Sequence, residues 1–222
     1  MKRILAVVIL FSFFISFFEL SWAKKEKTGK IEEDTLTDEI FGYKFNVLTN
    51  WKIKLENEPS LVRSILTKKN YPVNRSFNGT TEDRLIPTII ICADTSSFSL
   101  QEIENSLIKN QGNFKNKNDY LKNLEVIATY EFVQSKEIAL DSIAGKVYGF
   151  KKGYTRQSID PSARYGPDGS SVVTKEDYLI GEVILLKKGI NLYIIQLVGE
   201  KDYFELCEKE FSKMLETWKF LK

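Results

Sequence analysis

The sequence predicts an α+β fold, in which an antiparallel β-sheet is flanked by helices. Short segments in which apolar and polar residues alternate recur along the chain, as expected of strands with one buried face. Two of the last strands follow each other across a tight turn, which is typical of antiparallel pairing. Two other segments, near 99–109 and 203–215, have helical spacing of their apolar residues.

The first half of the chain is expected to supply four strands. The clearest is Tyr43-Lys44-Phe45-Asn46-Val47, which alternates strictly, and 86–94 is nearly continuous in apolar residues. Between these, 70–84 contains Pro72 and Asn78-Gly79 and is expected to be a loop. The predicted strands of this half are 43–47, 51–56, 61–68 and 86–94.

A capping signal marks the first helix. Ser99 stands three residues before Glu102, so the serine side chain can accept from the helix backbone while the glutamate reaches back to it. The helix is expected to run to about Lys109, and a second short helix is expected over 116–124.

The second half is expected to return to strands. After them, 155–174 is polar and contains Asp160-Pro161 and Pro167-Asp168-Gly169, which predicts a long connection. A hairpin should follow, with Lys187-Lys188-Gly189 as its turn. The predicted strands are 125–134, 138–140, 147–154, 178–186 and 190–198.

The chain is expected to end in an amphipathic helix and a short edge strand. Asp202 is a suitable N-cap, and 217–220 alternates as a strand does. The apolar residues of this helix fall on one stripe, which consists of Tyr203, Phe204, Cys207, Phe211, Met214 and Leu215.

The first 23 residues have the pattern of a secretory signal peptide. Lys2 and Arg3 precede an apolar run over 4–18, and Ser21-Trp22-Ala23 offers small residues at which cleavage after Ala23 is expected. The run is shorter than the roughly 20 residues that span a bilayer, so no stable membrane anchor should remain. Residues 24–38 are polar and are expected to form a flexible leader. Residues 39–222 are expected to form a single domain. The expected location is periplasmic or secreted.

Composition narrows the classes of function. The formal net charge is +2 and the chain has no histidine. A balanced surface does not favour nucleic acid, which needs a clustered basic face. Without histidine the Ser-His-Asp and Cys-His arrangements and the usual zinc ligand sets are excluded. We therefore expect no cofactor, no metal and no enzyme activity.

The two cysteines leave two readings open. Both Cys92, at the end of a strand, and Cys207, on the helical stripe, are expected to face the core. In an exported protein they can form a disulfide. The other reading, which we favour, is two buried thiols that act as small hydrophobic residues.

The order of these elements resembles the PsbP-like superfamily. The resemblance rests on the strand Gly42-Tyr43-Lys44-Phe45-Asn46-Val47, the Trp51-Lys52-Ile53 strand after it, and Ile143-Ala144-Gly145-Lys146-Val147-Tyr148 before the hairpin. That superfamily includes photosystem II extrinsic proteins, a Ran-binding nuclear import factor and small exported bacterial proteins. The resemblance covers about 39–222 and implies an α/β/α sandwich. It carries over no functional residue, and the signal peptide favours the exported bacterial branch.

The long polar connection is the best candidate for a partner-binding surface. It combines aromatic and arginine side chains, which are enriched in binding hot spots, on a loop projecting from a sheet. An ordinary solvent-exposed hairpin tip is the alternative. The candidate residues are Tyr154, Arg156, Arg164, Tyr165 and Asp168.

Three hypotheses of function follow from these features. The first is an exported, non-enzymatic protein that binds another envelope protein or acts as an accessory subunit. The second is a small apolar ligand held between sheet and helix. The third is a carboxylate-based hydrolase, for which Asp94 and Glu131 are the candidate pair.

Overall fold

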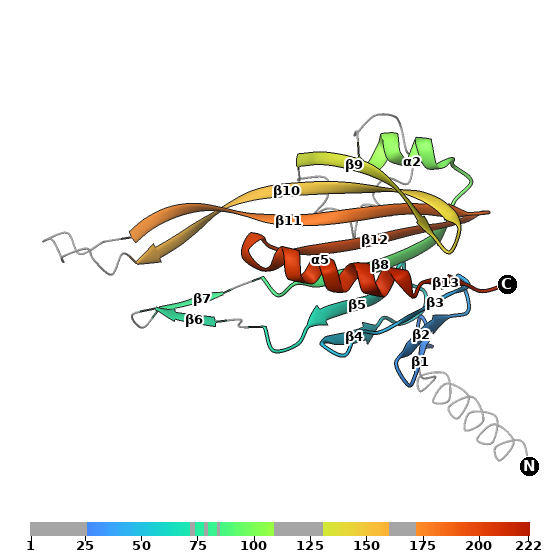
Figure 1. The fold of residues 1–222 in the computed structure, drawn as a ribbon, viewed down its shortest axis with the longest axis horizontal. Coiled ribbons are helices and arrows are strands. Elements are labelled where there is room, and N and C mark those ends of the chain that lie inside the picture. Colours follow the sequence, from blue (N-terminus) through green and yellow to red (C-terminus); the bar gives the residue numbers. More distant parts are fainter. Residues whose placement is uncertain (1–25, 72–73, 78–79, 84, 109–130, 160–171) are drawn as a thin grey trace, which may run out of the picture.

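The computed structural model describes residues 26–71, 74–77, 80–83, 85–108, 131–159 and 172–222. Its centre is a seven-stranded sheet in which every pair of neighbours is antiparallel (Figure 1). In spatial order its strands are β4 (Trp51–Leu55), β5 (Val62–Lys68), β8 (Thr88–Thr95), β12 (Asn191–Glu200), β11 (Val172–Lys188), β10 (Ile143–Ile159) and β9 (Glu131–Leu140).

Helix α5 (Lys201–Glu216) packs on one face of this sheet. Its apolar stripe, which includes Phe211 and Met214, joins a cluster with Ile89 and Ile91 of β8 and Tyr193 of β12. The helix begins one residue before Asp202, which lies in its first turn, so Asp202 is not the N-cap. The amphipathic helix predicted from sequence is confirmed.

Helix α2 (Leu100–Leu107) lies on the other face. Ile103 and Leu107 of α2 pack there with Cys92 of β8 and Ile194 of β12. The residues before and after these two along β8 and β12 lie on the opposite face, in the cluster with α5. The predicted capping box is confirmed: the Glu102 backbone N–H donates to the Ser99 hydroxyl at 3.2 Å, and the Ser99 N–H donates to the Glu102 carboxylate at 2.7 Å. The helix predicted over 116–124 lies outside the described residues.

The segment expected to be a flexible leader is ordered in its second part. Leu36 and Asp38 are buried in a four-stranded sheet in which β2 bridges β1 and β3. The prediction for 24–38 is therefore wrong from residue 30 on, because Thr35-Leu36-Thr37-Asp38 alternates over too few residues to stand out among charges. The strands of this sheet are β1 (Lys30–Glu32), β2 (Thr35–Asp38), β3 (Tyr43–Asn46) and β13 (Lys219–Phe220).

Two predicted loops contain strands. Residues 70–84 contain β6 (Asn74–Phe77) and β7 (Thr80–Asp83), which pair with each other and with no other described strand. The polar connection predicted over 155–174 is strand at both of its ends, since β10 continues to Ile159 and β11 starts at Val172, and 160–171 lie outside the described residues. In both places the strands consist mainly of polar residues, so they lack the alternation of apolar and polar residues that predicts a strand. Strands that extend past their neighbours in a sheet do not need this alternation.

Hydrogen bonds between loops close one end of the sheet, at the right in Figure 1. The Asp141 carboxylate, in the β9–β10 turn, accepts from the Phe220 N–H at 2.8 Å. The Leu221 N–H donates to the Gly42 carbonyl at 2.8 Å, and Lys188 Nζ donates to the Leu221 carbonyl at 3.0 Å. We call this region, where the β9–β10 turn, residues 38–42 and the C-terminal residues meet, the closed end.

No helix among the described residues is long and apolar enough to cross a membrane. The expected signal peptide lies outside the described residues, so its cleavage stays a prediction.

Candidate functional site

Strands β10 and β11 extend beyond their neighbours at the end of the sheet opposite the closed end. Strand β9 pairs with β10 only as far as Lys151, and β12 pairs with β11 only from Leu179 onwards. Beyond these points Gly153–Ile159 pairs with Val172–Tyr178 over seven residue pairs. At about 3.4 Å a residue this two-stranded ribbon reaches about 24 Å past the sheet. We call these two segments the ribbon.

A second hairpin extends towards the same end of the molecule. Strands β6 and β7 form it, and Figure 1 shows both hairpins reaching to the left of the sheet and of α5. The ribbon and the β6–β7 hairpin together make up what we call the twin-hairpin end.

Both hairpins are anchored at the junction of β12 and α5. The Leu85 N–H, just after β7, donates to the Glu200 carboxylate at 3.0 Å. The Tyr71 ring, just before β6, packs edge-on against Tyr203 with centroids 5.0 Å apart. One short stretch of chain therefore holds both ends of the β6–β7 hairpin.

The base of the ribbon is fixed at the same junction. The Tyr178 ring lies between two ammonium groups, with Lys151 Nζ 4.3 Å and Lys201 Nζ 5.1 Å from its centroid. Cation–π contacts of this kind contribute about 0.5–1 kcal/mol each at exposed sites. The junction thus positions the two hairpins relative to each other.

The structure places two of the five predicted site residues in the ribbon. Tyr154 pairs with Asp177 and Arg156 pairs with Lys175. They lie in a strand and not in a loop. The others, Arg164, Tyr165 and Asp168, lie outside the described residues. Sequence reasoning missed the β6–β7 hairpin and the anchor.

The candidate carboxylate pair does not form. Asp94 lies in β8 and Glu131 in β9, and β12, β11 and β10 separate these strands. Four strand spacings of about 4.8 Å put the two residues at least about 19 Å apart, whereas glycosidase carboxylates lie roughly 5–10 Å apart. The pair named from sequence is therefore wrong.

The two cysteines are free thiols on opposite faces of the sheet. Cys92 packs with the α2 cluster, and Cys207 packs with the α5 cluster. The disulfide reading is wrong because successive residues of β8 point to opposite faces, and Cys92 takes the face away from Cys207. Burial raises the pKa of Cys92 to about 12 and that of Cys207 to about 11, so both stay protonated at neutral pH.

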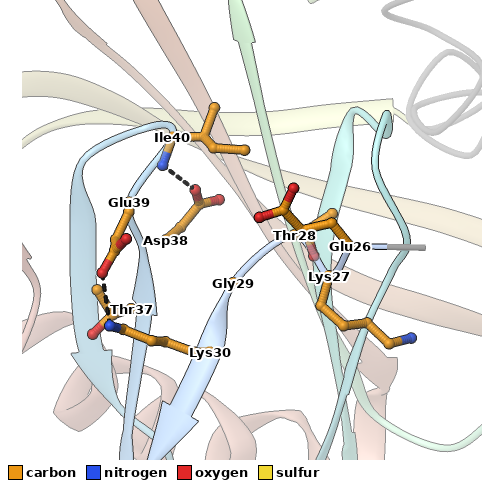
Figure 2. Close-up of a pocket in the computed structure, with 9 residues that line it drawn as sticks. All are labelled: Glu26, Lys27, Thr28, Gly29, Lys30, Thr37, Asp38, Glu39 and Ile40. Carbon is orange, nitrogen blue, oxygen red and sulfur yellow. Dashed lines mark hydrogen bonds and ion pairs between the residues drawn. The ribbon is translucent and has the colours of Figure 1, made fainter. Parts of the chain in front are cut away.

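A small pocket lies near the closed end, between the first residues of the described chain and the end of β2. Figure 2 shows it, with Lys30 paired to Glu39 at 2.7 Å on one side and Lys27 extending away from Asp38. Its volume is about 220 Å³, below the roughly 300–1,000 Å³ of small-molecule sites, which are mostly apolar. The lining residues are Glu26, Lys27, Thr28, Gly29, Lys30, Thr37, Asp38, Glu39 and Ile40.

A buried ion pair between Arg63 and Asp38 lies beside this pocket, and both side chains make several hydrogen bonds within the protein. Arg63 is the extra residue of a bulge in β5, between Val62 and Ser64, and bulges of this kind redirect side chains. Its Nε donates to the Asp38 carboxylate at 2.7 Å, and Nη1 and Nη2 donate to the Ser60 and Thr28 carbonyls at 3.0 Å. Glu58 accepts from Nη2 as well.

Asp38 has further hydrogen-bond partners besides Arg63. Its carboxylate also accepts from the Ile40 and Phe41 backbone N–H groups, each at 3.1 Å. Burial, with the Asp38 charge nearby, raises the pKa of Tyr43 well above its usual value. Since Arg63 and Asp38 bond to each other and to backbone groups on both sides, the cluster joins the two sheets, which is a structural role.

Other titratable clusters give no support for catalysis. Within the part of the chain that the structure describes, no three His, Cys, Asp or Glu side chains are grouped to hold a metal ion. The described pocket is charged at its rim and does not suit the apolar ligand of the second hypothesis.

No protein-family model and no curated protein matches the chain. Solved structures do match, and the PsbP-like outline seen in the sequence is found among them. The solution structure of cyanobacterial PsbP (CyanoP) from Synechocystis sp. PCC 6803 is 11% identical, with 86% of this chain and 96% of that chain covered and a TM-score of 0.46.

Two further matches are similar. LpqN of Mycobacterium tuberculosis, described as involved in cell envelope biogenesis, is 11% identical over 81% of this chain and 83% of its own, with a TM-score of 0.42. A mutant of the protein Mog1 is 8% identical over 90% of this chain and 97% of its own, with a TM-score of 0.40. At these scores no residue role is transferred from any of them.

Proposed function

We propose that this chain is an exported, non-enzymatic binding protein that holds a partner protein of the cell envelope at its twin-hairpin end. The observation that carries the proposal is the ribbon, in which two strands leave the sheet and continue for seven residue pairs, with no other strand of the described part of the chain beside them. A two-stranded hairpin is at best marginally stable in water. Its retention on a sheet that is otherwise complete without it favours a role in recognition.

The placement of the ribbon supports this role. A rigid sheet carries it, and the β12–α5 junction fixes its base through Lys151, Tyr178 and Lys201. Recognition segments commonly project from a rigid scaffold in this way. Tyr154 and Arg156 belong to residue types enriched in binding hot spots.

The proposal that the protein is not an enzyme rests on side chains. The chain has no histidine, the predicted carboxylate pair is separated by three strands, and both thiols are buried and protonated. The amino-terminal pattern of charge and apolar residues supports export and cleavage after Ala23. We retain the periplasmic or secreted location, the single domain and the α/β/α sandwich as parts of the proposal, with the start of the domain moved from residue 39 to before β1, because β1 and β2 belong to its small sheet.

Site-specific photocrosslinking in the envelope tests the proposal. A photoreactive amino acid is placed at Tyr154 or at Arg156, and in a matched control at Ile190, which is 67% exposed in the β11–β12 turn at the other end of β11. We expect a reproducible adduct from the first two positions and none from the control. Adducts from Ile190 alone, or from no position, would contradict the proposal.

A further inference from the structure

Exposed apolar side chains gather at the closed end. Among the described residues, the two most exposed large apolar side chains are Ile190, 67% exposed in the β11–β12 turn, and Ile40, 61% exposed in the β2–β3 turn. Phe98, in the connection between β8 and α2, is 37% exposed. Exposed apolar residues scattered singly are ordinary on protein surfaces. These three lie on neighbouring turns, so they call for a shared explanation.

Hydrogen bonds hold the three turns side by side. The Ile190 carbonyl accepts from the Ser96 N–H, in the connection between β8 and α2, at 2.7 Å. On the other side of the β11–β12 turn, Lys188 Nζ donates to the Leu221 carbonyl at 3.0 Å, and the Leu221 N–H donates to the Gly42 carbonyl of the β2–β3 turn at 2.8 Å. Figure 1 shows these turns together at the right of the molecule.

The turns themselves do not require isoleucine. Gly189, with a φ of 60°, and Ile190 form a two-residue turn between Lys188 and Asn191, and its second place usually holds Asn, Asp or Ser. The β2–β3 turn is fixed by its backbone, because the Ile40 N–H donates to the Asp38 carboxylate at 3.1 Å (Figure 2). Since both isoleucine side chains are mostly exposed, they contribute little to packing within the chain. Their presence favours an apolar contact outside it.

Lysines accompany these apolar side chains. Lys187 Nζ donates to the Phe98 carbonyl and Lys188 Nζ to the Leu221 carbonyl, so both ammonium groups lie at this end. In the part of the chain that the structure describes, neither lysine forms an ion pair with a carboxylate. Positive charge is therefore placed directly beside the exposed apolar residues.

A like-charge pair adds to this positive charge. Lys44 of β3 lies directly opposite Lys219 of β13, and both are exposed. Like charges in this arrangement destabilise a sheet. Asp141 pairs with Lys219 at 3.2 Å, and no described residue forms an ion pair with Lys44. An anionic surface facing this end would relieve the repulsion.

We infer that the closed end docks on an anionic lipid bilayer, with the Ile40 and Ile190 side chains inserted among the headgroups and the lysines against lipid phosphates. The strength of such binding grows with the apolar area buried and with the attraction of basic side chains to anionic lipids. The contact is peripheral and reversible and needs no membrane-spanning segment. The buried Arg63–Asp38 pair takes no part in it.

A bilayer suits this surface better than a folded protein does. A stable protein interface buries about 800 Å² on each partner in one closely fitting patch. Three apolar side chains on separate turns make a smaller and interrupted surface. A bilayer has no fixed shape to match, so it can accept each side chain separately. This inference does not depend on the partner-binding role proposed for the twin-hairpin end, which docking at the closed end would turn away from the membrane.

Vesicle binding tests the apolar contribution. The chain recovered after export is sedimented with vesicles of phosphatidylcholine alone or with an equal part of phosphatidylglycerol. We expect binding to the anionic vesicles, weakened by added salt. Ile40→Gln and Ile190→Gln together should weaken it about tenfold or more, because two apolar side chains no longer leave water. Leu206→Gln is the matched control, since Leu206 is exposed on α5 and should change binding less than about twofold.

The lysines are tested in the same assay. Lys187→Gln with Lys188→Gln should weaken binding to the anionic vesicles about tenfold or more, because each lysine near an anionic surface contributes. Lys52→Gln with Lys54→Gln, both exposed on β4, removes the same charge away from the closed end and should have a smaller effect. Thermal denaturation verifies that every variant is folded.

A fluorescent label reports which end meets the bilayer. Cys92 and Cys207 are buried, so a thiol introduced by Ile190→Cys can be labelled selectively with an environment-sensitive dye. Its emission should shift to the blue on anionic vesicles. A label at Tyr154→Cys, in the ribbon, should keep the emission that it has in water.

Each alternative has its own result. If the isoleucine variant binds anionic vesicles as the parent does while the lysine variant does not, the end recognises charge alone, as an acidic protein would supply, and the inference is overturned. No binding to anionic vesicles, or equal blue shifts at both labels, also overturns it. None of these results bears on crosslinking at Tyr154 and Arg156. A photoreactive residue at Ile190 should label lipid and still no protein.

Discussion

The two ends of the central sheet are built in opposite ways. At the closed end the Asp141 turn, the C-terminal residues and the segment after β2 are tied by hydrogen bonds, and the buried Arg63–Asp38 pair lies beside them. At the twin-hairpin end two strands continue without lateral partners among the described residues and are held only at their base.

This difference separates stability from recognition. Buried and mutually satisfied groups at the closed end fix how the small sheet packs on the large one. The ribbon extends past the strands that pair with β10 and β11 elsewhere in the sheet, and segments that project from a rigid scaffold commonly serve binding. Four experiments test this division, from the largest expected effect to the smallest.

Replacing the buried arginine should have the largest effect. Arg63→Met leaves Asp38, fully buried, as an uncompensated carboxylate, which costs about 3–5 kcal/mol of unfolding free energy. The measurement is chemical denaturation. Lys54→Met is the control, because the Lys54–Glu56 pair is exposed and should contribute no more than about 1 kcal/mol. If Arg63→Met lowers the unfolding free energy by less than about 1 kcal/mol, the closed end is not the source of stability that the comparison assigns to it.

Two glycines in the same strand pair compare the body of the sheet with the ribbon. A Cβ at Gly181 would meet the Phe150 ring at 2.1 Å and the Leu197 carbonyl at 2.3 Å, whereas a Cβ at Gly153 meets nothing within 4 Å. Gly181→Ala should therefore destabilise the protein by about 1–3 kcal/mol. Gly153→Ala should change the unfolding free energy by less than about 1 kcal/mol. Equal effects in thermal denaturation would mean that the ribbon is packed as tightly as the body.

Removing the ring at the ribbon base should act locally. Tyr178→Leu deletes the contacts with Lys151 and Lys201 and should lower the free energy of ribbon opening by about 1 kcal/mol. Amide exchange should become faster in 153–159 and 172–177 and stay unchanged at the closed end. Tyr178→Phe, which keeps the ring, is the control. Faster exchange throughout the sheet would show that the ribbon is not an independent unit.

Acidification should have the smallest effect of the four, a local weakening of the hydrogen bond between Asp141 and Phe220 at the closed end. The backbone hydrogen bond from Phe220, followed by Lys219, lowers the pKa of Asp141 below its usual 3.8. A pKa lowered by folding gives a contribution that is complete above the unfolded value and is lost as the pH falls through the folded one. The protection of the Phe220 amide, measured as its exchange rate relative to the intrinsic rate at the same pH, should therefore fall below about pH 3.8. Asp141→Asn, which keeps an acceptor but has no charge to lose, should show no such fall in protection.

Sequence reasoning succeeded where one face of an element is buried. Tyr43–Asn46, Trp51–Leu55, the hairpin about Lys188-Gly189 and the stripe of α5 all follow from the periods of 2 and 3.6. The Ser99–Glu102 capping box was predictable because its hydrogen bonds are local.

The failures have two physical causes. The strand Thr35–Asp38 is short, and the ribbon and the β6–β7 hairpin extend past the apolar core, so their residues show no apolar period. Which face Cys92 takes, and the distance from Asp94 to Glu131, depend on strand order, which a single sequence does not encode locally. Tyr154 and Arg156 were selected from residue type alone, and their role in binding stays a prediction. The β12–α5 anchor, made by Tyr71, Leu85 and Glu200, had no sequence signal.

Excising the ribbon tests the division between the two ends most directly. Residues 155–176 are replaced by Asn-Gly, which joins Tyr154 to Asp177, opposite each other in the register, through a type I′ turn. The unfolding free energy should stay within about 1 kcal/mol of the parent chain, while the envelope partner is no longer captured. Full capture by the shortened chain, or its failure to fold, would contradict the account.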